Sequence, residues 1–159
     1  MNSYEKLLSE ADDNNIIVRE VPLISNSHGL YKNNRIALNK NTLNNISEKA
    51  CVLAEELGHH YTSYGNILDL NKVENSKQEY KARLMAYNKL IGLKGIIDSF
   101  NAGCKTITEM AEYLDVTEKF LNEALECYKS KYGFSATLDN YVIFEPRFSI
   151  MNANFCNNS

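Results

Sequence analysis

The stretch CVLAEELGHHYTS, Cys51–Ser63, places two carboxylates and two imidazoles at helical spacing. Glu55 and His59 are four residues apart, one helical turn, so both side chains can reach a single ion. Glu56 and His60 form a second such pair, rotated by about 100° around the helix. These residue types suit metal binding, with a neighbouring carboxylate able to take a proton from metal-bound water.

Chemistry distinguishes the two registers. If Glu55 and His59 are ligands, the residue after the first ligand is Glu56, which can act as a general base. In the other register that position is Leu57, which cannot accept a proton. Only the first register gives a peptidase, and His60 is then either a substrate contact or a surface residue. The alternative to both is a solvated helix face whose Glu–His contacts contribute a few tenths of a kcal/mol each.

Two further residues favour a site. Gly58 lies inside the predicted helix, where glycine costs about 1 kcal/mol relative to alanine, so another backbone is expected to pass close by. Glu79 lies on the apolar arc of a later helix, and a carboxylate points that way only when it has a partner. An ion pair with Arg83, four residues on, explains Glu79 equally well. Cys51, one turn before Glu55, is expected to be a buried structural thiol.

The elements that must position these residues follow from apolar spacing and turn residues. In chain order we predict a helix at 3–13, a strand at 16–23, a hairpin of 30–32 and 35–39 around Asn33-Asn34, the motif helix from its cap at Asn45 to about Tyr61, a second helix from about Ser76 to Ile91, three short helices in 94–131, a late strand at 141–150 and a loose tail. The hairpin offers a strand edge that could bind an extended peptide.

The segment Thr108–Glu126 has the apolar spacing of a helix-turn-helix. Its charged residues are acidic except for Lys119: Glu109, Glu112, Asp115, Glu118, Glu123 and Glu126. Because a recognition helix must approach phosphates, we expect no direct DNA binding and predict a packing or partner-docking module.

The bulk composition is that of one compact unit. The chain has 159 residues, 44% of them hydrophobic, and a net charge of -3. No apolar run approaches the roughly 20 residues that span a bilayer, and the polar N-terminus is unlike a signal peptide. The four cysteines form no C-x-x-C pair. We therefore expect a cytoplasmic protein with reduced thiols and no membrane partner.

Three segments together resemble the ImmA/IrrE family of metallo-endopeptidases, in particular its short phage and prophage members. They are GLYKNNRIALN, CVLAEELGHHYTSYGNIL and KQEYKARLMAYNKLIG, and the resemblance covers about residues 15–133. It implies an α+β, zincin-like minimal metallopeptidase fold, with a small antiparallel sheet, a motif helix and a second ligand helix. The expected division is a metallopeptidase-like core at 1–100, an HTH-like helical segment at 101–133 packed on that core, and a late strand and tail at 134–159.

The family motif L-A-H-E-L-G-H reads L-A-E-E-L-G-H here. Carried over by position, Glu56 matches the catalytic glutamate, His59 the second histidine ligand and Glu79 the downstream glutamate ligand. Glu55 stands where the first histidine ligand is expected. The resemblance implies a divalent metal, with zinc expected, and the oxygen of Glu55 also suits Mn²⁺ or another hard ion.

The resemblance further implies a substrate: an HTH-type repressor of a phage or mobile element, cut or inactivated to relieve repression. His60, Tyr31 and Arg35 are candidate substrate contacts. A catalytically impaired antagonist, which binds the repressor on the same fold without cutting it, is the alternative function.

Overall fold

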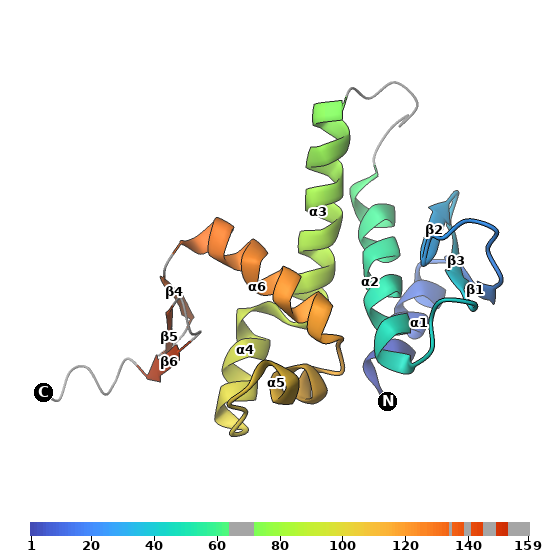
Figure 1. The fold of residues 1–159 in the computed structure, drawn as a ribbon. Helices are drawn as coiled ribbons and strands as arrows, with labels where there is room; N and C mark the ends of the chain where they lie inside the picture. Colours follow the sequence, from blue (N-terminus) through green and yellow to red (C-terminus); the bar gives the residue numbers. More distant parts are fainter. Residues whose placement is uncertain (64–71, 134, 139–140, 145–148, 153–159) are drawn as a thin grey trace, which may run out of the picture.

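The computed structural model describes residues 1–63, 72–133, 135–138, 141–144 and 149–152, and Figure 1 shows their arrangement. The elements are α1 (Ser3–Asp13), β1 (Ile17–Val21), β2 (Gly29–Lys32), β3 (Arg35–Asn39), α2 (Ile46–Thr62), α3 (Lys72–Leu90), α4 (Gly92–Asn101), α5 (Ile107–Leu114), α6 (Glu118–Tyr132), β4 (Ser135–Leu138), β5 (Tyr141–Phe144) and β6 (Ser149–Asn152). The predicted α+β class is confirmed, as are the early helix, the hairpin, the motif helix and the three short helices. The second long helix begins at Lys72, earlier than predicted.

The N-terminal sheet has the strand order β1-β3-β2. Asn33 and Asn34 both have positive φ and form the predicted tight turn, which makes β2 and β3 antiparallel. β1, however, pairs with β3 in parallel. The prediction of an antiparallel sheet was therefore wrong for one of its two strand pairs.

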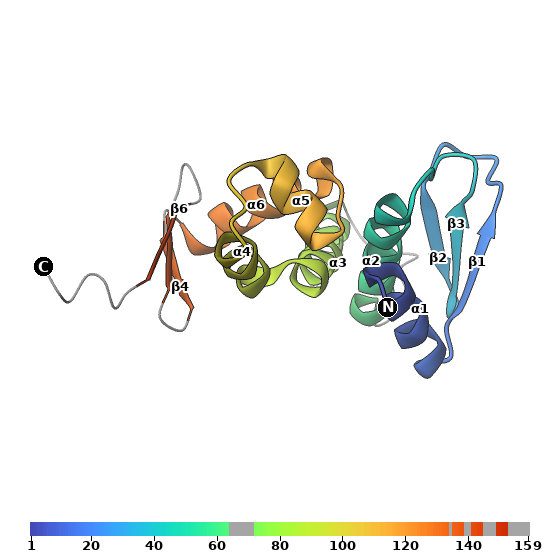
Figure 2. The same cartoon turned by 90° about the horizontal axis from the view of Figure 1, so that it is seen from below.

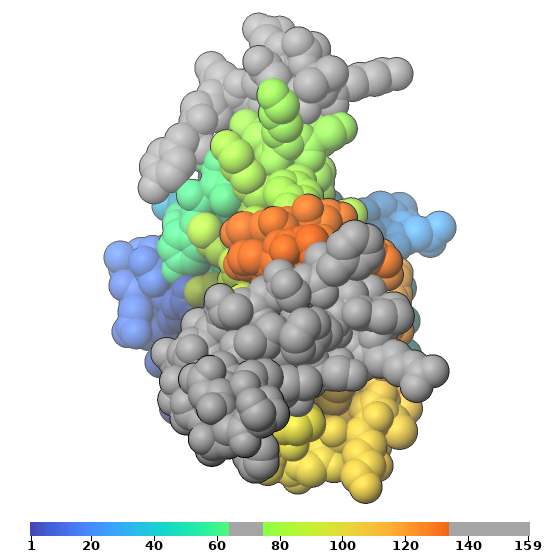
Figure 3. Space-filling view, turned by 90° about the vertical axis from the view of Figure 1, so that its left-hand side faces the viewer, coloured from blue at the N-terminus to red at the C-terminus, as the bar shows by residue number. Residues whose placement is uncertain are grey.

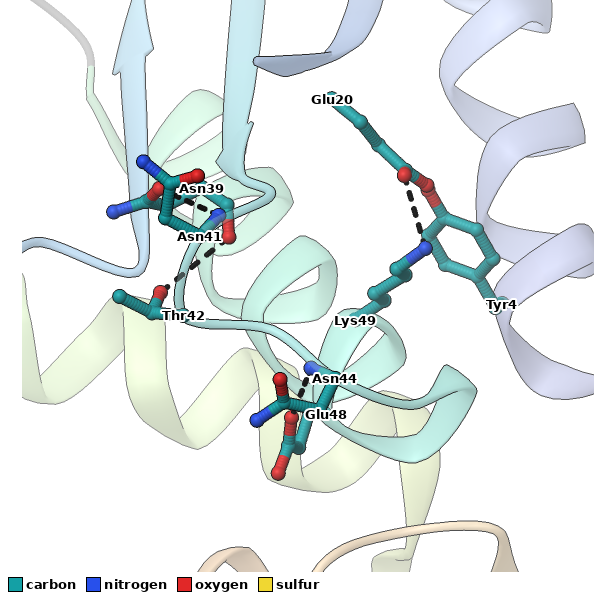
Figure 4. Close-up of polar contacts among 8 residues, drawn as sticks. All are labelled: Tyr4, Glu20, Asn39, Asn41, Thr42, Asn44, Glu48 and Lys49. Atoms are coloured by element: carbon teal, nitrogen blue, oxygen red, sulfur yellow. Dashed lines mark hydrogen bonds and ion pairs between the residues drawn. The ribbon is translucent and has the colours of Figure 1, made fainter. Parts of the chain in front are cut away.

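A buried asparagine at the end of β3 holds the loop that connects β1 to β2. After β1 the chain must cross the end of the sheet before β2 can begin. The Asn39 side chain, 1% exposed, accepts a hydrogen bond from the Leu23 N–H and donates one to the Ser27 carbonyl at 2.9 Å. It also accepts one from the Asn41 N–H (Figure 4). These bonds satisfy the connecting loop's backbone, a tertiary effect that strand patterns do not reveal.

The helices cover one face of this sheet in layers (Figure 2). α1 and α2 pack against the sheet, and α3 packs on the other side of α2. Ile36 and Leu38 of β3 meet the inner face of α2, where Leu53 and Leu57 are fully buried. No described element covers the opposite face of the sheet.

The start of α2 is fixed by caps and an ion pair. The Asn45 side chain accepts the Glu48 N–H at 2.9 Å, as the capping pattern predicts. Lys49 Nζ lies 2.9 Å from Glu20 Oε2, and the Tyr4 hydroxyl donates to Glu20 Oε1 at 2.7 Å (Figure 4). This triad joins α1, β1 and α2. It therefore helps to fix the position of α2, which carries the motif, relative to the sheet.

The helical segment α4–α6 packs on α3. In Figure 3, α6 lies beside α3. No helix in the described ranges is long and apolar enough to cross a membrane.

The late strand was predicted as one element, but the chain forms three. β4, β5 and β6 make a separate antiparallel sheet. The prediction merged β5 and β6 into one strand at 141–150, because periodicity alone does not separate two short runs that lie close together in the sequence. Pro146 and the tail residues 153–159 lie outside the described residues.

Candidate functional site

Glu56 lies beside the free edge of the sheet. A Cβ built on Gly29 of β2 would lie only 2.6 Å from Val52 Cγ1 and 3.0 Å from both Cγ and Oε1 of Glu56. Glycine at this position therefore lets α2 approach β2 and brings the Glu56 carboxyl against the strand backbone. Burial, together with the charges of the nearby Glu55 and Glu79 carboxylates, raises the pKa of Glu56 to about 7. A group with this pKa can accept and release a proton near neutral pH.

On its other side α2 meets α3 at very short range. A Cβ on Gly58 would collide with the backbone carbonyl of Ala82. The prediction that another backbone passes close to Gly58 is confirmed.

That close approach brings His59 to Glu79. His59 Nε2 lies 3.6 Å from Glu79 Oε1, so the predicted meeting of these two side chains is present. The Glu79 side chain is 52% exposed, however, and the prediction that it points inward was wrong. Its length lets it leave the apolar arc and reach His59 and Arg83 at the surface.

Glu55 points into different surroundings. It lines a cavity of about 290 Å³ together with Cys51, Val52 and residues of α6, including Phe120. Burial raises the pKa of Glu55, and Arg83 is the strongest influence in the opposite direction. The predicted convergence of three ligands is therefore met by His59 and Glu79 but not by Glu55.

The donor set fits a metal ion in part. Two ligands at about 2.0–2.2 Å from a tetrahedral ion lie roughly 3.4 Å apart, which matches the separation of His59 and Glu79. Among the described residues, no three His, Cys, Asp or Glu side chains form a group that could hold a metal. Glu55 lies one helical turn before His59. Its side chain would have to adopt another rotamer for its carboxylate to serve as the third ligand.

Two of the three candidate substrate contacts lie near Glu56. The Tyr31 hydroxyl is 2.8 Å from His60 Nδ1, and the two rings meet edge to face at 5.4 Å. Tyr31 pairs with Ile36 across the hairpin and so faces the helices. Arg35, the next residue back along β3, faces the other way and lines a concavity on the open face of the sheet. The structure therefore does not bring Arg35 together with the other two.

Two residues near the site were not singled out as functional from the sequence. Arg83 Nε lies 3.9 Å from Glu79 Oε2, an ion pair that the i,i+4 spacing does predict. Its influence on Glu55 crosses from α3 to α2 and has no local signal. Glu123 of α6 lines both the cavity beside Glu55 and a groove beside Glu79. In the sequence it is one acidic residue among several.

Cys51 is the buried thiol that was predicted. It is 6% exposed, its Sγ lies 4.0 Å from Thr117 Oγ1, and burial raises its pKa to about 11. Cys104 and Cys127 are also free thiols, while Cys156 lies outside the described residues.

In the described residues, α2 thus lies between the outer strand β2 and α3, which supplies the Glu79 carboxylate. Residues 11–126 match the family model of the IrrE N-terminal-like domain, peptidase M78, and the chain belongs to this family. This family membership confirms the resemblance to the ImmA/IrrE peptidases. No protein with a curated description matches the chain.

Proposed function

We propose that this chain is a metal-dependent endopeptidase whose site is built from Glu55, Glu56 and His59 of α2 and Glu79 of α3. The observation that carries the proposal is the 3.6 Å approach of His59 to Glu79, close to the partly buried carboxyl of Glu56 beside the outer strand β2. Membership of the M78 peptidase family supports the reaction class and a divalent metal.

Within this proposal the residues have distinct roles. Glu55, His59 and Glu79 hold the ion, with zinc expected and manganese compatible with the two carboxylates. The bound ion would lower the pKa of a water molecule and polarise the scissile carbonyl. Glu56 would take a proton from the attacking water, whose oxygen bonds to the scissile carbonyl carbon, and would give that proton to the amine that leaves as the C–N bond breaks, a role that a pKa near neutrality favours.

The edge of β2 gives the substrate a place to bind. β2 is an outer strand, and its backbone at Gly29 lies against Glu56. A peptide that adds to this edge as a further strand would carry a peptide bond past Glu56. Tyr31 and His60, hydrogen-bonded to one another at the same helix–strand boundary, are the proposed substrate contacts.

The proposed substrate is an HTH-type repressor of a phage or mobile element, which also places the reaction in the cytoplasm. All six acidic side chains of the segment Thr108–Glu126 are exposed. Such a surface disfavours direct DNA binding and suits contact with the positive surface that a repressor presents to DNA.

A repressor antagonist that does not cut its partner is the second candidate. It is favoured by one observation, that the described residues gather only two donors and not three. The fold, the strand edge and the acidic surface would serve binding equally well.

One experiment separates these functions. The protein is purified without affinity metals, its bound metal is measured by mass spectrometry, and it is incubated with the cognate repressor with and without a chelator. Cleavage that the chelator abolishes is the result we expect. Stoichiometric repressor binding by a metal-free protein without cleavage would establish the antagonist, and neither binding nor cleavage would contradict both.

A further inference from the structure

The N-terminal sheet has one face that no helix covers among the described residues (Figure 2). This face forms a concavity of about 880 Å³, and the residues that line it include three cations and no carboxylate. We define the open sheet face as five of its exposed members: Ile17, Arg19, Leu30, Lys32 and Arg35.

Two of the cations face one another across the hairpin. Lys32 of β2 is the direct cross-strand partner of Arg35 on β3. Like charges at directly opposed positions of a sheet are destabilising. Neither these two side chains nor that of Arg19 has an ion pair or a hydrogen bond within the part of the chain that the structure describes. An anion supplied from outside would therefore relieve a repulsion that the fold leaves in place.

Exposed aliphatic side chains lie among these cations. Ile17 and Leu30 are each 49% exposed. Sheet surfaces that bind single-stranded nucleic acid combine cations with aromatic rings on which bases stack. The lining of this concavity includes no aromatic ring, and Tyr31 between Leu30 and Lys32 points to the helices, where it meets His60. Cations mixed with aliphatic groups suit a peptide that carries both acidic and apolar residues.

The open sheet face is continuous with the strand edge proposed to bind the substrate. β2 is an outer strand, and the side chains of a strand added to it would alternate between the two faces of the sheet. One set would lie on the side of Tyr31 and Glu56. The other set would lie beside Leu30 and Lys32, which are two residues apart on the open face.

A second copy of the chain fits this face less well. Its acidic segment Thr108–Glu126 has the complementary charge. A contact between that segment and the open sheet face would be heterologous, however, and would leave one unpaired surface at each end of a growing chain of molecules.

We infer that the open sheet face is a docking surface for an acidic, partly apolar segment of the substrate protein. The inference rests on the proposed function, since the same segment adds to β2. Its alternate side chains would place an acidic group beside Lys32 and an apolar group beside Leu30. Arg35 and Arg19 would extend the positive surface across the sheet, which favours the choice of an acidic partner.

The test measures binding and needs neither metal nor cleavage. The probe is a fluorescein-labelled peptide of repeated Glu-Thr-Leu-Thr, titrated with the protein in a chelator and followed by anisotropy. The matched peptide of repeated Lys-Thr-Leu-Thr should not bind. Lys32→Glu should bind the acidic peptide at least about tenfold more weakly than the native protein does. Lys6→Glu, the same change of charge at an exposed position of α1, should bind it normally.

Lys32→Glu also separates docking from folding. It replaces a like-charge pair with an opposite-charge pair to Arg35, so its stability in urea should equal or exceed that of the native protein. Leu30→Ser should weaken binding as well. Its effect should persist in high salt, whereas the effect of Lys32→Glu should shrink because salt screens exposed charges.

Four results would overturn the inference. They are no binding of the acidic peptide by the native protein, equal binding by Lys32→Glu, tighter binding of a single-stranded oligonucleotide than of the peptide, and concentration-dependent polymers of the native protein that Lys32→Glu does not form. A native protein that docks the peptide but cuts no repressor would contradict the peptidase and leave the docking surface standing.

Discussion

The two sides of α2 carry adjacent carboxylates with different chemical surroundings. On the strand side, Glu56 lies against the backbone of β2, and burial together with the Glu55 and Glu79 carboxylates raises its pKa to about 7. On the helix side, burial also raises the pKa of Glu55, but the nearby charges there have both signs: Arg83 and Lys119 oppose the rise, and Glu123 and Glu79 add to it. The two carboxyls therefore share partial burial and differ in the charges of their neighbours. The strand side suits a carboxyl that exchanges a proton near neutral pH.

Removing the base on the strand side should have the largest effect on function. Glu56→Gln keeps the shape of the side chain but cannot accept a proton, so we expect repressor cleavage to fall by about 10³-fold. Binding of the repressor should be retained, as measured by fluorescence anisotropy with labelled repressor. Asp12→Asn, at an exposed position of α1 outside the proposed site and the acidic surface, is the control and should cut normally. Equal cleavage by both variants would show that the strand side holds no catalytic base.

The helix side depends on the contact between α2 and α3. Gly58→Ala drives a methyl group into the Ala82 carbonyl, so we expect a loss of about 3 kcal/mol in the free energy of unfolding. Gly95→Ala is the matched control, because its methyl group would meet side chains and not backbone, Leu114 at 3.2 Å and Ile91 at 3.7 Å. Urea unfolding followed by circular dichroism compares the two. Similar stabilities for both variants would mean that the helices are not in such close contact.

The burial of Glu56, reinforced by the Glu55 and Glu79 carboxylates, should appear as a pH dependence of stability. Because the pKa of Glu56 is higher in the folded protein than in the unfolded chain, its contribution is fully present below about pH 4.5 and is lost as pH rises to about 7. The loss is at most about 3 kcal/mol. Metal-free Glu56→Gln should therefore be more stable than the native protein at pH 8 and similar to it at pH 4.5. Chemical unfolding at both pH values measures this difference, and a stability gain at pH 8 no larger than that of Asp12→Asn would contradict it.

Glu55→His tests the helix side with the smallest expected change. It restores the usual ligand type of the family and removes one negative charge. We expect zinc affinity to rise by about tenfold relative to manganese affinity, because imidazole suits zinc better than a carboxylate does. Any peptidase activity should also rise, since a more positive centre acidifies its bound water more strongly. Competitive metal titration of the metal-free proteins measures the first effect, and equal zinc affinity and cleavage would show that Glu55 is no handicap.

The sequence predicted most of what lies within single elements. The α2 motif, its cap at Asn45 and the Asn33-Asn34 turn follow from local spacing and residue type, and Gly58 indicated a close backbone contact before the partner was known. Effects that cross between elements were not predictable. The strand pattern does not reveal that β1 and β3 pair in parallel or that the Asn39 side chain holds the loop between β1 and β2. The influence of Arg83 on the pKa of Glu55 requires α2 and α3 to pack together.

The direct test of the site is a crystal structure of the protein soaked with zinc or manganese, with anomalous scattering used to locate the ion. The account predicts a single ion within about 2.2 Å of His59 Nε2 and of one oxygen each of Glu79 and Glu55. Glu55 would then have turned from its cavity toward His59, and Arg83 would have moved away from Glu79. An ion bound elsewhere, or no ion while His59 and Glu79 remain together, would contradict the proposed metal site.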